Sequence, residues 1–149
     1  MALTSLRVDR GTDRELLILT SLDCHFCRVL NESDDMEEMP ITTVKVLSDW
    51  GPKDQIANMV IFKSLDPKAQ FKHLLTGGTL DPATVDWTRD VTAEYNENRT
   101  LFNTLQQQFQ IDGNPNFIVK EPDGTYTLIE PKYADPVEVF VNTVRPYLT

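Results

Sequence analysis

The stretch that decides the fold covers residues 16–27 and reads Leu-Leu-Ile-Leu-Thr-Ser-Leu-Asp-Cys-His-Phe-Cys. It opens with a continuous apolar run, Leu16–Leu19, which predicts a buried central strand. Two cysteines follow at once, Cys24 and Cys27, in a segment that favours a short helix ending near Asn31. They are the chain's only cysteines, so their three-residue spacing is the most informative feature of the sequence.

The spacing of the two cysteines suits thiol chemistry. A thiol attacks as its thiolate, and a place in the first turn of a helix directs backbone N–H groups and the positive end of the helix dipole at the Cys24 sulfur. His25 adds a nearby positive charge when it is protonated. Cys27 lies one helical turn further on and is expected to be more buried. We therefore expect Cys24 to attack a substrate disulfide and Cys27 to resolve the mixed disulfide.

Two other readings of the cysteine pair remain open at this stage. The first is a disulfide that only ties a turn, although so short a loop removes little entropy from the unfolded chain. The second is a zinc site, which needs about four ligands. The chain offers Cys24, Cys27, His25 and His73, and His25 lies between the cysteines. We expect no metal and no cofactor.

Working outward, further segments show helical or strand periodicity bounded by proline, glycine or aspartate. They are a strand at Ile41–Leu47, helices around Ile56–Lys63, Asp66–Leu75 and Asn98–Gln110, a short segment Asp81–Trp87, a hairpin of Asn116–Lys120 and Tyr126–Glu130, and a last helix from Asp135 to Leu148. In the first of these helices, Ile56, Met59, Val60 and Lys63 follow the spacing of an apolar face.

The order of elements indicates an α/β class. Alternation of strands and helices predicts a sheet with a parallel part, and the hairpin adds an antiparallel part. We therefore expect a mixed central sheet flanked by helices, in one domain over residues 1–149. A helical insertion at about 52–110 separates the half that carries the cysteines from the half that carries the hairpin.

Composition excludes several classes of partner. Lys plus Arg is 14 and Asp plus Glu is 23 among 149 residues, which gives a net charge of −9. Such a balance disfavours nucleic acid and anionic membrane surfaces, because both recruit clustered positive charge. No apolar run approaches the roughly 18 residues of a membrane span. The first residues, 1–11, show no secretory leader.

A second feature, Gly113-Asn114-Pro115, stands directly before the strand at Asn116–Lys120. A proline after a glycine and before a core strand is a place where a cis peptide bond occurs. The commoner alternative is an ordinary trans proline that opens the strand.

The cysteine pair and the Gly113–Pro115 loop together resemble the thioredoxin superfamily, in which a cis-proline loop faces the CxxC. From about Arg14 to Tyr147, the chain is similar to the catalytic domain of the bacterial periplasmic disulfide isomerases, the DsbC and DsbG group. Four segments carry the resemblance. They are Leu16–Cys27, Val44–Gly51 with its Trp-Gly bend, Ile56–Gly77, and Phe109–Val119.

The resemblance implies a thioredoxin-like fold and roles for named residues. Cys24 corresponds to the exposed nucleophile and Cys27 to its partner. His25 and Phe26 occupy the dipeptide that tunes the redox potential. Pro115 corresponds to the cis-proline.

The resemblance also bears on substrate contacts and organisation. Asn114 corresponds to the residue whose backbone pairs with substrate. The position six before Cys24 is Ile18, where thioredoxin itself has a buried acid. The family's N-terminal dimerisation domain has no counterpart here, and we expect either a monomer or a dimer.

The sequence thus predicts a thiol-disulfide oxidoreductase that acts on cysteine-containing protein substrates by interchange or isomerisation. The resemblance implies a membrane-bound or soluble redox partner and a periplasmic location, with the cytoplasm as the alternative. A second hypothesis is a peptide-binding, chaperone-like module on the same fold with little redox turnover. Phe26 and Trp50 are candidates for an apolar peptide-binding patch under either hypothesis.

Overall fold

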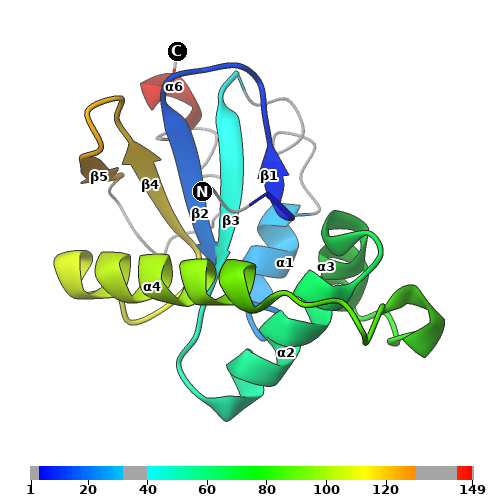
Figure 1. Ribbon diagram of the computed structural model, residues 1–149. Coiled ribbons are helices and arrows are strands. Elements are labelled where there is room, and N and C mark those ends of the chain that lie inside the picture. The colour runs from blue at the N-terminus through cyan, green and yellow to red at the C-terminus, as the bar shows by residue number, and fades with distance from the viewer. Residues whose placement is uncertain (1–3, 32–39, 130–143, 149) are drawn as a thin grey trace.

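The computed structural model describes residues 4–31, 40–129 and 144–148. Its centre is a five-stranded sheet in the order β1-β3-β2-β4-β5 (Figure 1). The strands are β1 Arg7–Val8, β2 Glu15–Thr20, β3 Thr42–Leu47, β4 Asn116–Lys120 and β5 Tyr126–Leu128. Among the described strands, β2 and β3 run parallel, and the other pairings are antiparallel. The predicted mixed sheet is confirmed.

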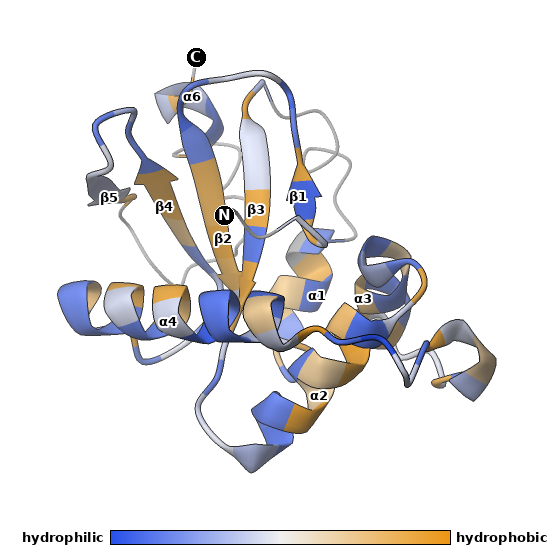
Figure 2. Ribbon diagram, in the orientation of Figure 1, coloured by the Kyte–Doolittle hydropathy of each residue, from blue (hydrophilic) through white to orange (hydrophobic). Residues whose placement is uncertain are grey.

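Strand β2 buries side chains on both of its sides. Both faces of the sheet at β2 are therefore covered. Leu17 and Leu19 pack with Phe102 and Leu105 of helix α4, Thr92–Phe109. Figure 1 shows α4 crossing one face of the sheet, with α1 behind the other face. Figure 2 shows the hydrophobic middle of β2 and β4 against the more hydrophilic exposed side of α4.

The described part of the chain also contains several shorter helices. These are α1 His25–Asn31, α2 Pro52–Lys63, α3 Pro67–Leu75, the 3-10 turn η2 Pro82–Thr84, and α6 Arg145–Tyr147. Helix α2 contacts both α3 and α4. Cys27 of α1 packs with residues of α2 and α3 and with Leu47 of β3. The inner cysteine is therefore part of the hydrophobic core.

Two of the aspartate–proline boundaries noted in the sequence cap the elements that follow them. The Asp66 carboxylate accepts the Ala69 N–H at 3.1 Å, and Pro67 is the first helical residue. Asp81 repeats the device by accepting from the Ala83 N–H at 3.0 Å. Aspartate offers an acceptor to free N–H groups, and proline has no N–H to lose there.

The predicted apolar face of α2 is confirmed only in part, because Met59 packs against the core but Ile56 does not. Ile56 is 70% exposed, whereas the buried residues of this helix are Asn58, Ile61 and Phe62. The helix starts at Pro52 rather than near Ile56, and its outward side carries an isoleucine. A polar residue takes one inward position because the Asn58 side-chain amide donates to the Ser48 carbonyl at 3.0 Å.

Two other expectations change in extent. Helix α4 begins at Thr92, six residues before the predicted start at Asn98, and β1 was not predicted at all. The last predicted helix, Asp135–Leu148, lies mostly outside the described residues, and α6 is the described part of it.

Candidate functional site

A disulfide joins Cys24 and Cys27 at the start of α1, with their Cα atoms 5.2 Å apart. Cys24 directly precedes the helix and is half-buried, while Cys27 is 3% exposed. The Cys27 N–H donates to the Cys24 sulfur at 3.1 Å. Cys24 thus keeps part of its surface exposed while its sulfur accepts a backbone hydrogen bond, and Cys27 is buried in the core.

Both aromatic residues singled out in the sequence, Phe26 and Trp50, are exposed. Phe26 is 46% exposed and lies edge-on to the ring of His25, with the ring centroids 5.5 Å apart. Trp50, after β3, is 45% exposed and packs edge-on against the buried Phe102. Asp23 forms an exposed ion pair with Lys53 at 3.0 Å. Such a pair contributes little to stability, so we assign it no structural role.

The loop before β4 meets the end of β3. The Asn114–Pro115 peptide bond is cis. The Asn114 side-chain amide donates to the Ser48 hydroxyl at 2.6 Å, and Ser48 is 1% exposed. The Ser48 carbonyl in turn accepts from Asn58. A buried polar chain therefore fixes the loop to β3 and α2.

Pro115 and Cys27 line one small cavity of about 10 Å³ beneath the disulfide. The structure thus brings together two of the predicted site residues that are 88 positions apart in sequence. Lys45 of β3 and Asn31 of α1 line the same cavity. The Lys45 ammonium lies 3.5 Å from the Asn31 side-chain oxygen and 5.2 Å from the centroid of the Phe71 ring.

Burial lowers the pKa of Lys45, and the positive charges of Lys72 and Lys68 lower the pKa further. The unfolded side chain titrates near its usual value of about 10.4. Between the lowered pKa and that value, the unfolded chain binds more protons than the folded one. The free energy of unfolding therefore rises with pH across this window.

Lys45→Met is expected to raise the free energy of unfolding at pH 7 by about 1 kcal/mol, because it removes a charge that folding desolvates. In the variant, the free energy of unfolding should no longer rise with pH between the lowered pKa of Lys45 and about 10.4. Urea unfolding at several pH values measures both effects. Lys53→Met, at a side chain that is 83% exposed, is the control. Parallel pH curves for wild type and Lys45→Met would contradict this account.

Sequence reasoning missed Ser48 and Lys45. A signal for Lys45 exists in the alternation of β3, because Thr43, Lys45 and Leu47 share one face of the sheet and Leu47 is 1% exposed. A lysine on that face is unusual enough to single out. Ser48 offers no comparable signal, because its partner Asn114 is 66 residues away.

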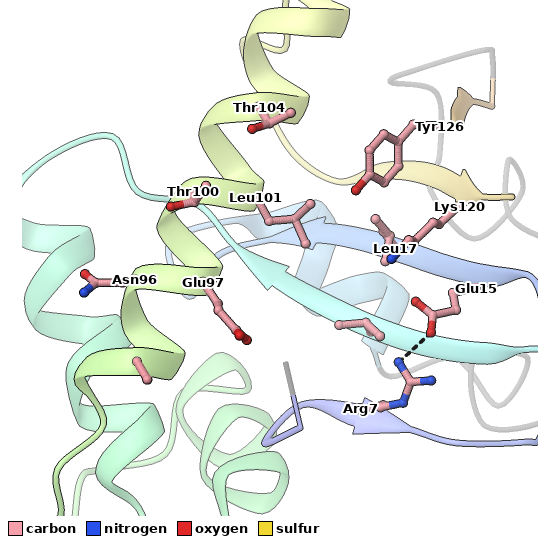
Figure 3. Close-up of a pocket in the computed structure, with 12 residues that line it drawn as sticks. Arg7, Glu15, Leu17, Asn96, Glu97, Thr100, Leu101, Thr104, Lys120 and Tyr126 are labelled. Atoms are coloured by element: carbon pink, nitrogen blue, oxygen red, sulfur yellow. Dashed lines mark ion pairs between the residues drawn. The ribbon is translucent and has the colours of Figure 1, made fainter. Parts of the chain in front are cut away.

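A larger cavity, of about 540 Å³, lies between α4 and the sheet (Figure 3). Leu17 and Leu101 line it, and an ion pair of 2.7 Å between Arg7 and Glu15 lies at one side. None of the predicted site residues lines this cavity. The cysteine pair therefore lies in surroundings separate from this cavity.

Within the described ranges, no cluster of three or more His, Cys, Asp or Glu side chains is arranged to hold a metal ion. Nor does any described helix have the length and apolar character needed to cross a membrane.

No protein-family model and no curated protein sequence matches the chain. Solved structures do. A disulfide interchange protein from Neisseria gonorrhoeae aligns over 89% of this chain and 91% of its own, with 19% identity and a TM-score of 0.52. Wolbachia pipientis alpha-DsbA1 aligns over 96% of this chain and 89% of its own, with 11% identity and a TM-score of 0.68.

The catalytic domain of Proteus mirabilis ScsC aligns over 91% of this chain and 84% of its own, with 17% identity and a TM-score of 0.57. The three structures and this chain share the arrangement of a mixed sheet with flanking helices. The thioredoxin-like fold expected from the sequence is confirmed. At these identities the likeness concerns the fold, and function rests on the residues themselves.

Proposed function

We propose that the chain is a thiol-disulfide oxidoreductase acting on cysteine-containing proteins through Cys24 and Cys27. One observation carries the proposal: a half-buried Cys24 is bonded to a buried Cys27, and Cys27 lines a small cavity together with Pro115. A structural staple needs neither an accessible sulfur nor a neighbouring loop. The likeness to disulfide interchange proteins supports the same chemistry.

In the reduced state, the Cys24 thiolate attacks a substrate disulfide and one substrate thiolate leaves. The Cys27 thiolate then attacks the Cys24 sulfur of the mixed disulfide, the second substrate thiolate leaves, and the protein becomes oxidised. Isomerisation occurs when the substrate's own thiolate resolves the intermediate first. A soluble or membrane-bound redox partner restores the starting state.

The surrounding residues take supporting roles in this proposal. His25 and Phe26 tune the reduction potential of the pair. The backbone of Asn114 pairs with an extended substrate segment in the manner of an added strand. The Asn114 side chain is already engaged by Ser48, so the loop is held in place before substrate arrives. Exposed Phe26 and Trp50 offer apolar contacts to a substrate.

The finer assignment is disulfide interchange or isomerisation of the DsbC and DsbG kind by a catalytic unit comprising residues 1–149. The periplasm is the proposed location, because an oxidising compartment suits a disulfide that is used and renewed, and the cytoplasm is the alternative.

The reduction potential of the Cys24–Cys27 pair in a glutathione buffer series tests the proposal. A value between about −120 and −200 mV is expected for an oxidant or isomerase. A value near −270 mV, that of thioredoxin, would overturn the isomerase assignment and make the protein a reductase. Exposed Phe26 and Trp50 favour one alternative, a peptide-binding module. A disulfide that never exchanges with glutathione would overturn the oxidoreductase proposal and favour that alternative.

A further inference from the structure

The cavity of about 540 Å³ between α4 and the sheet has the size of a site for a small organic ligand. Side chains from all five strands form its floor, and one side of α4 forms its wall (Figure 3). Leu17 of β2 and Val44 of β3 are buried there, and the half-buried Leu101 reaches in from α4. The cavity therefore offers an aliphatic surface to a ligand.

The positive charge of Lys120 lies at this cavity without an acidic partner. In the register of the sheet, Lys120 of β4 lies directly opposite Glu15 of β2. Oppositely charged residues in such positions attract each other, but Glu15 binds Arg7 at 2.7 Å instead. The neighbouring Glu121 is engaged as well, because Arg14 donates to both of its oxygens, at 3.0 and 3.1 Å. Within the described residues, no carboxylate pairs with Lys120.

A phenol group accompanies this ammonium group. Tyr126 of β5 lies directly opposite Lys120 in the pairing of β4 with β5. Both side chains line the cavity, and Figure 3 shows the Tyr126 hydroxyl pointing into it. In the part of the chain that the structure describes, no residue forms a hydrogen bond with that hydroxyl. An ammonium and a phenol hydroxyl can therefore both donate to one ligand group.

The balance of charge in the cavity suits a ligand with one negative charge. Arg7 and Lys120 balance Glu15 and Glu97, the acidic residues of the described lining. Arg7 and Glu15 already form an ion pair, and Glu97 reaches in from α4 one helical turn before Leu101. One available cation matches one carboxylate, whereas a dianion would bring more negative charge than this lining compensates.

We propose that this cavity binds a small organic monocarboxylate, with its carboxylate on Lys120 and Tyr126 and its apolar body against Leu17, Val44 and Leu101. A carboxylate accepts hydrogen bonds from both donors, and charge-assisted bonds of this kind are the strong ones. The apolar body replaces water at the aliphatic surface, which favours binding. This function goes beyond disulfide exchange and does not depend on it, because none of the described lining residues belongs to the redox pair or the proline loop.

Naphthalene-2-carboxylate is the probe, titrated into the isotope-labelled, oxidised protein at constant ionic strength and followed by amide chemical shifts. We expect saturable shifts centred on the cavity, at Leu17, Val44, Leu101, Lys120 and Tyr126. Naphthalene-2-carboxamide has the same body without the charge, and it is expected to bind at least about tenfold more weakly, since one charge-assisted contact corresponds to roughly that factor. Equal affinities for the two probes, or shifts centred on Phe26 and Trp50, would overturn the proposal.

Lys120→Gln is expected to weaken binding of the carboxylate probe by at least about tenfold and to change the affinity for the carboxamide by less than about twofold. Lys120 is only half-buried, so the circular dichroism of the variant should match that of the wild type. Lys53→Gln removes the same charge outside the cavity, from a side chain that is 83% exposed. It is expected to change either affinity by less than about twofold, because distant charges are screened. Equal losses of carboxylate affinity in the two variants would mean that Lys120 does not hold the carboxylate.

Discussion

Cys24→Ser is expected to reduce insulin-reductase or isomerase activity by at least about 100-fold, to the uncatalysed background. The serine hydroxyl is not ionised at neutral pH and cannot form a mixed disulfide. We expect the loss of activity to come from the missing thiolate and not from unfolding, because Cys24 is only half-buried and contributes little to the core. Far-UV circular dichroism of the reduced variant should match that of the reduced wild type.

Cys27→Ser gives the sharper comparison. This variant keeps the outer thiol but lacks the group that resolves the intermediate, so mixed disulfides with substrate should accumulate on Cys24. Non-reducing electrophoresis detects them as adducts that disappear with dithiothreitol. If Cys24→Ser retained activity, or if Cys27→Ser formed no adducts while Cys24→Ser did, the assigned roles of the two cysteines would be wrong.

The parts of the fold that sequence predicts well are those set by neighbouring residues. Strand β4 has the predicted bounds Asn116–Lys120, because a compact apolar run begins after a proline and ends at a turn. The start of α3 is likewise set by nearby residues. The Asp66 carboxylate accepts the Ala69 N–H, and the proline ring of Pro67 suits the first helical position. The CxxC pair belongs to this class, since spacing alone places both sulfurs on one turn.

The parts that sequence did not predict depend on partners distant along the chain. Helical periodicity identified the inward side of α2 only in part, because the inward position of Asn58 is justified only by the Ser48 carbonyl ten residues earlier. The two-residue strand β1 is defined by its pairing with β3, and no local pattern marks so short an element.

The same limit applies to the candidate site. Sequence patterns single out Cys24, Cys27 and Pro115 separately. The cavity that Cys27 and Pro115 share forms only when the strands pair in the sheet. In that sheet, β2 leads into α1 and pairs with β4, which follows the proline. Lys45 reaches the cavity from β3, the other neighbour of β2.

Three asparagines from different elements converge on the end of β3, immediately before Trp50. Asn58 of α2 and Asn114 of the proline loop bind Ser48, as described above. Asn98 of α4 binds Leu47 through both of its side-chain groups, because its oxygen accepts the Leu47 N–H and its nitrogen donates to the Leu47 carbonyl, each at 2.8 Å. The amide of Asn98 therefore takes the place of a neighbouring strand at this edge.

Asn98→Ala is expected to lower the free energy of unfolding by about 2–4 kcal/mol, because it leaves the buried N–H and carbonyl of Leu47 without partners. Asn98 is itself 1% exposed, so water does not replace the lost hydrogen bonds without a local opening. Urea unfolding of the oxidised protein measures the change. Because the same edge carries Ser48 and Trp50, the intrinsic fluorescence of the folded variant should change as well.

Asn96→Ala is the matched control, since Asn96 lies two residues away on the exposed side of α4, and its cost should remain within about 0.5 kcal/mol. Asn98→Asp separates the two hydrogen bonds. The carboxylate still accepts from the Leu47 N–H but cannot donate to the carbonyl, and its charge is buried, so this variant should be no more stable than Asn98→Ala. A cost for Asn98→Ala as small as that of Asn96→Ala would mean that the end of β3 is held by the sheet alone, and that the amide of Asn98 contributes no net stability there.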